Sequence, residues 1–509
     1  FVSSPTVAIA DSALNLIFFP LLGVILWRIP PLAAGIEYSQ RLKKYRNIMV
    51  VYFSFGLIFS VWCVNQLGSD IRKNEMLLQQ KNIPLNLSEL QKSYAAQGPV
   101  SPELNKIIRD ENPLSDLYQV VDNDADTICA SPEEQKKYQL LFMKFKISLD
   151  AAEDILMNNP PRFAQDFNSS RIAPGLILPN FNTVRALARV NHLRMRLDAA
   201  NNQPKKVLKN FYQNMRLAEI CYNHNTIISG LVANAVIGIT CDDFGLILAQ
   251  VQFSTEELQQ LEKYLADFTL QMPEKIKYLY SSDYAIFEVF ADCIRGKFSM
   301  QELYYDQPVK NPAQPKLPLA IYALYDLDNY FFWANGCNSL LQANLAQVEM
   351  FENPDLALHD YPQYCREKLQ KSPVFQHKLV KLMLDQMPNP LEIFLKYQTK
   401  LNLIRLACKI EIFKQKNGRL PADLNELNWQ NMPLDIAQKQ PFQYDIGEFD
   451  FKSNAYNYKA PAKKMKGYRL KSRDVIRLFP DWRQKKNFNK NLDFIVGLPE
   501  KSAHNPPEQ

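Results

Sequence analysis

The chain contains little glycine: 15 of its 509 residues, against a usual frequency of about 7% in globular proteins. Glycine supplies the positive φ angles of tight hairpin turns and β-bulges. Its scarcity therefore argues against an all-β sandwich or barrel. Apolar residues make up 47% of the chain, which excludes a wholly disordered protein.

Several short motifs of known chemistry are also missing. The sequence contains no GxxxxGK[ST], HExxH, GxSxG or GxGxxG, the motifs that hold phosphates, zinc, a nucleophilic serine or a dinucleotide. Its eight cysteines include no CxxC or CxxCH, so a zinc ribbon, a thioredoxin-type site and a c-type haem lack support. We therefore predict no cofactor and no bound metal, and we favour a non-enzymatic protein.

Long apolar runs are present near the start of the sequence. Residues 47–69 carry no charge over 23 positions, and about 20 apolar residues span the hydrocarbon core of a bilayer. Residues 13–27 are also apolar and contain Pro20. They reach the length of a span when the mixed stretch from Phe1 is added, which requires the span to accommodate Asp11. Residues 1–70 are therefore predicted to form a membrane hairpin in the lipid bilayer.

The loop between these two segments is basic. It contains one acidic residue, Glu37, and five basic ones: Arg28, Arg41, Lys43, Lys44 and Arg46. Short loops rich in Lys and Arg stay in the cytoplasm. We therefore expect residues 28–46 to be cytoplasmic and the bulk of the chain after residue 69 to be periplasmic, held at a bacterial inner membrane.

The rest of the chain is predicted to be mainly α-helical. Residues 71–175 are interpreted as a juxtamembrane connector, 176–418 as a helical domain, 419–498 as a small mixed module and 499–509 as a disordered tail. In the connector, a helix is expected from about Glu134 to Met157, before prolines stop it. Its apolar face is predicted to contain Leu140, Leu141, Phe145, Leu149 and Ile155.

The helical domain shows apolar residues at three- and four-residue intervals, which is typical of amphipathic helices that need a partner helix. A short break at residues 201–204 predicts an antiparallel hairpin. The run from Ile227 to Leu248 is expected to be one buried helix, and Ser254 with Glu257 a capping box. Stacked hairpins would form either a TPR-like solenoid, with a concave face for a partner, or an irregular bundle.

Four residues are candidates for a pocket: His192, His224, Asp242 and Asp243. Pairing of the predicted helices would bring the histidines close to the carboxylates, as a metal or general-base site requires. The alternative is that the histidines cap helices and that the carboxylates lie at a solvated helix end. Cys221 and Cys241 would form a disulfide in an oxidising compartment, or remain buried free thiols.

Positive charge is concentrated near the C-terminus. Residues 452–490 carry thirteen Lys and Arg against two Asp, interleaved with aromatic residues. Beyond a membrane, we expect such a segment to bind anionic lipid, an acidic glycan or an acidic partner, and not nucleic acid. An ordinary solvated surface is the alternative. The predicted contacts are Lys463, Lys464, Lys466, Arg469, Lys471 and Arg473.

Three stretches carry a resemblance: Asn74–Leu90, His192–Gln250 and Lys409–Leu427. Their order resembles a family of uncharacterised, membrane-anchored helical proteins of the bacterial envelope. The third stretch also resembles the pattern of major pseudopilins: a helix, then Asn-Gly-Arg-x-Pro, then a segment with prolines and aromatic residues up to Tyr444. A pseudopilin has glutamate at its fifth position, where this chain has Pro5. The resemblance therefore indicates a shared structural solution and implies no activity.

These observations leave three hypotheses for the function. The first is a membrane-anchored envelope protein whose helical domain binds a partner protein. The second is a subunit of a larger membrane complex, in which the predicted membrane helices pack against other chains. The third is an envelope hydrolase, which would need convergent polar groups around His192, His224 or an acidic residue.

Overall fold

The computed structural model describes most of the helical part of the chain and a small sheet. The described ranges are 68–95, 114–124, 132–158, 181–224, 226–272, 390–435, 439–451, 463–472 and 493–497, together with isolated positions. The chain divides into two compact units. The first comprises residues 1–85, 286–348 and 363–387, and the second comprises 86–285, 349–362 and 388–509.

A helix over residues 68–80 belongs to the first unit. Its buried Asn74 donates a hydrogen bond of 2.8 Å from Nδ2 to Oδ1 of Asn338, which ties two distant segments together. The predicted membrane segment 13–27 lies outside the described residues. Only scattered positions of the segment 47–69 are described, and these are helical. The membrane hairpin stays a prediction.

The second unit is mainly helical and carries one small sheet. Its helices are α3 (Leu87–Ala95), α5 (Ser115–Asp124), α6 (Pro132–Lys144), α7 (Lys146–Asn158), α8 (Phe181–Ala200), α9 (Pro204–Asn223), α10 (Ile227–Cys241), α11 (Phe244–Gln250), a helix over residues 255–272, and α17 (Pro390–Asn417). A 3-10 turn and three strands follow, η3 (Leu424–Leu427), β1 (Gln443–Phe451), β2 (Lys463–Lys471) and β3 (Asp493–Gly497).

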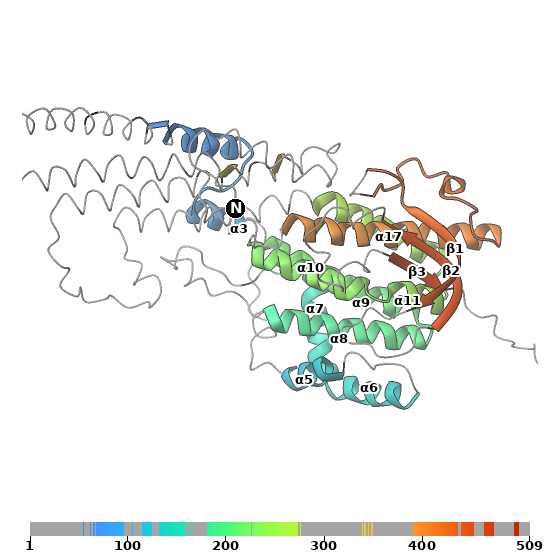
Figure 1. Ribbon diagram of the computed structural model, residues 1–509. Helices are drawn as coiled ribbons and strands as arrows, with labels where there is room; N and C mark the ends of the chain where they lie inside the picture. Colours follow the sequence, from blue (N-terminus) through green and yellow to red (C-terminus); the bar gives the residue numbers. More distant parts are fainter. Residues whose placement is uncertain are drawn as a thin grey trace, which may run out of the picture. The chain divides into compact units, whose positions relative to one another are not determined.

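Three helices form the centre of the second unit. Helices α8, α9 and α10 all contact one another, and α17 packs against α10 (Figure 1). Three residues, 201–203, connect α8 to α9, so this pair is an antiparallel hairpin, as the sequence predicts. Gly238 allows α10 to approach α17 closely, because a Cβ at this position would lie 2.7 Å from the Tyr397 ring.

Local capping explains where several helices begin and end. The predicted capping box is confirmed: Ser254 N–H donates to Glu257 Oε2 at 2.8 Å, and Glu257 N–H donates to Ser254 Oγ at 3.2 Å. A second box, between Thr226 and Ser229, begins α10 and was not predicted. Gly418, with φ of 70°, ends α17, as the Asn-Gly pair indicates.

The expected single helix over Ile227–Leu248 is wrong in one respect. It is broken at Asp242 and Asp243, and Asp243 has φ of 59°. Within the described part of the chain, Ile227–Gln250 is the one stretch that could cross a membrane by length and composition, and 67% of its most apolar window is buried. Core helices of soluble proteins meet the same criterion. Here α10 packs against α8, α9 and α17.

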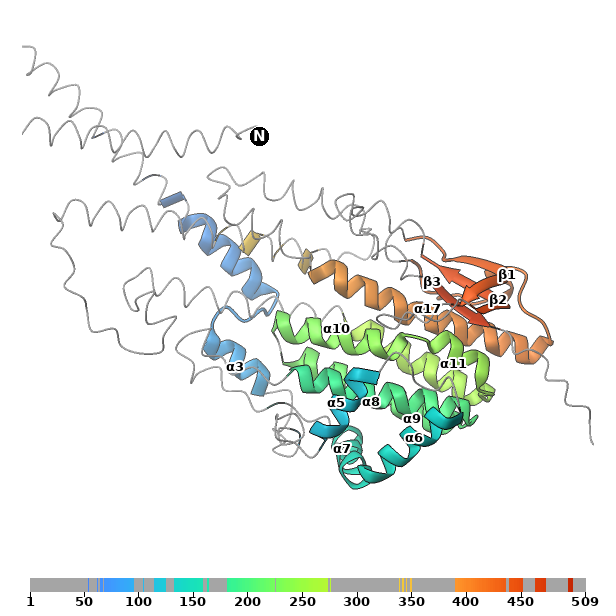
Figure 2. The ribbon, with the colours of Figure 1, turned by 60° about the horizontal axis from the view of Figure 1, so that its bottom comes forward.

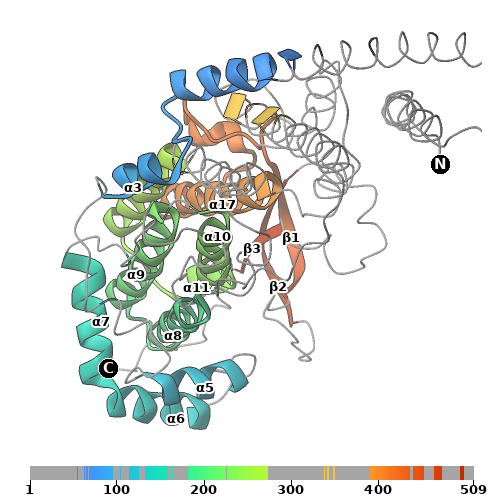
Figure 3. The ribbon, with the colours of Figure 1, turned by 90° about the vertical axis from the view of Figure 1, so that its left-hand side faces the viewer.

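The helix expected over Glu134–Met157 is also two helices, α6 and α7, which meet at Phe145. Figures 2 and 3 show that they run at an angle to each other. Leu149 and Leu156 are buried, but Leu140 is 59% exposed. Leu140 was therefore wrongly placed on the apolar face that packs against the core.

The sheet of the second unit is antiparallel, in the order β1-β2-β3. A small sheet was expected after Gly418 and is present, in the same compact unit as the helices. Tyr468 and Leu470 of β2 and Val496 of β3 are buried, and β2 and β3 contact α17. Helix α11 lies so close to β3 that a Cβ at Gly245 would overlap the carbonyl oxygen of Ile495.

Candidate functional site

Two of the four predicted pocket residues lie where α10 ends and α11 begins, and a third lies on a neighbouring helix. Asp242 caps α10 and Asp243 precedes α11, while His192 lies on the neighbouring helix α8. Burial and the nearby Arg196 guanidinium lower the pKa of His192 to about 4, and the Asp242 carboxylate opposes this shift. The charge of Asp242 thus acts on His192, but the predicted pocket stays a prediction.

Cations from two other helices neutralise the carboxylates of this junction. Lys400 of α17 lies 3.0 Å from Asp242 Oδ1, and Arg196 of α8 lies 3.8 Å from Asp243 Oδ2. Burial lowers the pKa of Lys400, but Asp242, Tyr397 and Cys241 together outweigh burial, so the pKa is raised overall. Both carboxylates are thus held in ion pairs between helices, and neither is a lone exposed charge.

Lys396 lies one helical turn before Lys400 on α17, and both ammonium groups lie over the Tyr397 ring, at 5.8 and 5.5 Å from its centroid. Burial and the neighbouring Lys400 lower the pKa of Lys396 to about 8, against the opposing effect of Asp242. An amine with a lowered pKa is more readily deprotonated. The junction of α10 and α11 therefore contains two carboxylates, those of Asp242 and Asp243. The basic side chains associated with them are His192, Arg196, Lys396 and Lys400.

His224 does not join this cluster. It follows α9, next to the start of α10, whereas Asp242 follows the end of α10. The 15 residues of α10 separate the two by about 22 Å at 1.5 Å per residue. The His224 ring is enclosed by three aromatic rings, whose centroids lie 5.5 to 6.0 Å away: Tyr94, Phe163 and Phe181.

The environment of His224 is that of a core residue. It is fully buried, and its Nδ1 lies 3.3 Å from the Thr226 hydroxyl oxygen. Burial lowers the pKa of His224 to about 3, so the ring is neutral near pH 7. The predicted grouping of both histidines with the carboxylates is therefore not what this fold produces.

The chemistry available at the junction is limited. Nδ1 of His192 is buried and has no hydrogen-bond partner among the described residues. Within the same part of the chain, no group of three or more His, Cys, Asp or Glu side chains is placed to hold a metal ion. Cys221, Cys241 and Cys408 are buried free thiols. The free-thiol alternative is thus the one the structure contains, and the disulfide is not formed.

A second cluster of charges was not predicted from the sequence. Glu262 accepts hydrogen bonds from the Arg405 guanidinium at 3.1 and 3.2 Å and lies 3.5 Å from the Lys409 ammonium. Both cations also lie over the Trp429 ring, at 5.6 and 5.1 Å from its centroid. These contacts join the helix 255–272, α17 and the loop after it. Arg405 and Glu262 lie 143 residues apart in the chain. Because they are so far apart, no local sequence pattern could predict this cluster.

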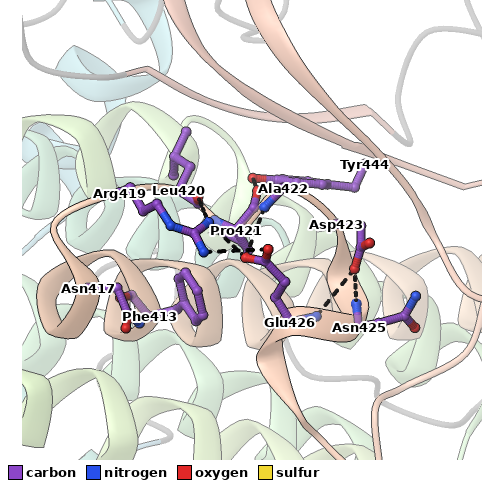
Figure 4. Close-up of polar contacts among 10 residues, drawn as sticks. All are labelled: Phe413, Asn417, Arg419, Leu420, Pro421, Ala422, Asp423, Asn425, Glu426 and Tyr444. Carbon is purple, nitrogen blue, oxygen red and sulfur yellow. Dashed lines mark hydrogen bonds and ion pairs between the residues drawn. The ribbon is translucent and has the colours of Figure 1, made fainter.

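The loop between α17 and the sheet is held by its own polar contacts (Figure 4). The Arg419 guanidinium donates to Glu426 Oε2 at 2.8 Å, and Ala422 N–H donates to the same oxygen at 3.1 Å. Asp423 accepts from the backbone N–H groups of Asn425 and Glu426 in η3, and the Tyr444 hydroxyl donates to the Pro421 carbonyl at 3.0 Å. The Asn-Gly-Arg-x-Pro stretch therefore forms a self-contained connection.

Part of the predicted anion-binding segment is matched with acidic residues. The pairing of β1 with β2 sets Asp450 opposite Lys464, Glu448 opposite Lys466 and Asp445 opposite Arg469. Arg469 forms an ion pair of 2.7 Å with Asp445. Lys463 and Lys471 face Phe451 and Gln443 in the same register, and Arg473 lies outside the described residues. The contact with an anionic partner stays a prediction.

An exposed apolar face lies on α6 and α7. Leu140 is 59% exposed, Met143 71% and Ile147 87%. They are spaced by three and four residues, so they lie on one side of these helices. Contiguous exposed apolar residues mark interaction surfaces more often than isolated ones do. Sequence periodicity did not find this face, because it assigned Leu140 to the core.

Comparison of the chain with protein-family models, with curated proteins and with solved structures finds no match.

Proposed function

We propose that this chain is a membrane-anchored component of the bacterial envelope whose helical domain binds a partner protein without catalysing a reaction. The exposed apolar face formed by Leu140, Met143 and Ile147 carries this proposal. Burying three such side chains in a partner would contribute several kcal/mol, at about 1.5 to 3 kcal/mol for each fully buried aliphatic side chain. A surface of this kind is suited to protein association.

The charges of the second unit support a structural role for its interior. The carboxylates of Asp242, Asp243 and Glu262 are in ion pairs between helices. Buried ion pairs that join elements fix the packing of those elements. A hydrolase would need an unpaired carboxylate or a basic histidine aimed at a substrate, so the partner-binding hypothesis accounts better for these contacts.

The membrane anchor and its orientation rest on the sequence. The uncharged run 47–69 and the basic loop 28–46 support a hairpin that places the later chain in the periplasm. The resemblance to membrane-anchored helical envelope proteins supports the same arrangement. The pseudopilin-like stretch supplies the connection between α17 and the sheet, and we assign it no role in secretion.

The contacts among α8, α9 and α10 are compatible with both architectures considered for the helical domain. In a solenoid of helical hairpins each repeat contacts its neighbours, so the first helix of one hairpin also packs against the next hairpin. We place the partner on the outer face of α6 and α7, because exposed apolar residues lie there.

The test is purification of the full chain from native membranes in mild detergent, with mass spectrometry of the co-purifying proteins. We expect a partner protein in stoichiometric amount, absent from a purification of an unrelated membrane protein with the same tag. A chain that purifies alone under several mild detergents would contradict partner binding. Contacts that depend only on residues 1–70 would favour a subunit packed within the bilayer.

A further inference from the structure

The outer face of α6 and α7 has a regular composition. Seven exposed positions follow alternating steps of three and four residues, which keeps them on one side of the helices. The order is acidic, basic, three apolar, then two acidic. The residues are Glu133, Lys136, Leu140, Met143, Ile147, Asp150 and Asp154.

The apolar residues lie around the junction of the two helices. Helical hydrogen bonds continue through it, from Phe145 N–H to the Leu141 carbonyl at 3.3 Å and from Leu149 N–H to the Phe145 carbonyl at 3.0 Å. Figures 2 and 3 show the change of direction. Since Tyr138 and Leu149 are buried on the inner side, the exposed apolar residues lie on the outer, convex side.

Positive charge surrounds the apolar residues. Lys136, Lys144 and Lys146 are all exposed and lie within four residues of Leu140, Met143 or Ile147 in sequence. Lys144 also covers the Phe145 ring, at 5.2 Å from its centroid. The surface thus has an apolar centre, a basic surround and acidic ends.

We propose that this convex surface docks into an apolar pocket of a partner protein, and that carboxylates flank the pocket. This inference rests on the proposed function and assigns the chemistry of the partner. Carboxylates would pair with Lys136, Lys144 and Lys146. These pairs would orient the two proteins and raise their rate of association.

Two other occupants fit the charges less well. An anionic lipid surface would attract the lysines but would repel the acidic ends, Glu133 at one and Asp150 with Asp154 at the other. A second copy of the same face, related by a two-fold axis, would bring one set of lysines against the other. A protein pocket can match both signs of charge.

The test replaces Met143 by the photoreactive residue p-benzoylphenylalanine in the full chain, in its own cells. Irradiation is expected to give one dominant adduct, whose crosslinked peptide lies in another protein beside apolar and Asp or Glu residues. The same residue placed at Leu270, which is 82% exposed on the helix 255–272, is the matched control and should not give this adduct.

The charge requirement is tested in the same experiment. Combined Lys136→Glu, Lys144→Glu and Lys146→Glu substitutions should reduce the yield of the adduct about tenfold, which corresponds to about 1.4 kcal/mol. The neutral set, Lys136→Gln, Lys144→Gln and Lys146→Gln, should reduce it less. All three lysines are exposed, so the thermal midpoint of both variants should stay close to that of the unsubstituted chain.

Several outcomes would overturn the inference: an adduct with phospholipid, an adduct with a second copy, no adduct, or a yield that charge reversal leaves unchanged. These outcomes differ from failure of the proposed function. If the unsubstituted chain still co-purifies with a stoichiometric partner, partner binding stands and only the assigned surface is wrong.

Discussion

His224 makes the stability of the protein depend on pH. The ring is neutral in the folded chain down to about pH 3, whereas the unfolded chain protonates it near pH 6.5. Below pH 6.5 the unfolded state therefore binds the extra proton, and stability is lost as the pH falls. The loss amounts to about 1.4 kcal/mol per pH unit, or about 2 kcal/mol at pH 5.

The substitution His224→Leu should remove this dependence, because leucine does not titrate and fills a pocket lined by aromatic rings. Urea unfolding of the full chain in detergent would be compared at about pH 7 and about pH 5. We expect the unsubstituted chain to lose about 2 kcal/mol more than the variant over this range. Equal losses would mean that His224 is protonated in the folded state.

Gly245 is required by the contact between α11 and β3. A Cβ here would overlap the backbone oxygen of Ile495, which cannot rotate away as a side chain does. Gly245→Ala should therefore destabilise the protein by about 1 to 3 kcal/mol, the usual cost of overpacking. Gly447→Ala is the control, since its Cβ would meet the Phe449 ring at an ordinary 3.7 Å. Thermal unfolding should be unchanged in the control, and a similar loss in both variants would refute this assignment.

Between elements, the pair of Asp242 and Lys400 joins α10 to α17 and is mostly removed from solvent, with side chains 22% and 14% exposed. Each of Asp242→Asn and Lys400→Met should destabilise the protein, because each leaves its partner unpaired. The double variant should cost less than the two single variants together, with a coupling energy of about 1 to 3 kcal/mol.

The comparison pair for this cycle is Arg469 and Asp445, which is more exposed, at 32% and 50%. Its coupling energy should be only about 0 to 1 kcal/mol, because water screens exposed charges. Denaturant unfolding of the single and double variants measures both couplings. Additive effects at Asp242 and Lys400 would show that the pair does not hold the two helices together.

Elements with local signals could be predicted from the sequence. The capping box at Ser254 and the Asn-Gly end of α17 need only residues within one turn, and both are found. The breaks at Asp243 and Phe145 could not be predicted. Apolar residues continue beyond each break and no proline marks either, and Gly245, two residues after Asp243, does not by itself locate the break. At Phe145 the change of direction turned Leu140 away from the core.

The candidate site was predicted only in part, because some of its residues lie far apart in the sequence. Residues on helices that lie close together in sequence, such as His192 on α8 and Asp242 after α10, can be grouped from the order of the helices. The cation that pairs with Asp242 lies 158 residues later in the chain, at Lys400. His224 was misplaced although the predicted helix over Ile227–Leu248 already lies between it and Asp242, and the 15 residues of α10 separate the two by about 22 Å at 1.5 Å per residue.

At the scale of the whole molecule, net charge alone does not identify a binding surface. The chain has a formal charge of +6, and residues 452–490 exceed this on their own, with thirteen Lys and Arg against two Asp. In the part of this segment that forms β2, the antiparallel register brings acidic residues of β1 opposite Lys464, Lys466 and Arg469. Among these positions, Arg469 forms an ion pair with Asp445, which reduces the field that Arg469 presents to a partner. We therefore expect a charged partner to bind the lysines beside the apolar residues of α6 and α7 rather than the cations of β2.

The arrangement of the chain across a membrane is the property that most affects which partners it can meet. If residues 28–46 are cytoplasmic, Gln40→Cys should react with a membrane-impermeant maleimide only after the inner membrane is permeabilised. Leu270→Cys, in the helical domain, should react before permeabilisation, because its side chain is exposed and lies beyond the predicted spans. The unsubstituted chain measures the labelling of its own cysteines. The reverse pattern would place the helical domain in the cytoplasm, where the partner that docks on α6 and α7 would have to be sought.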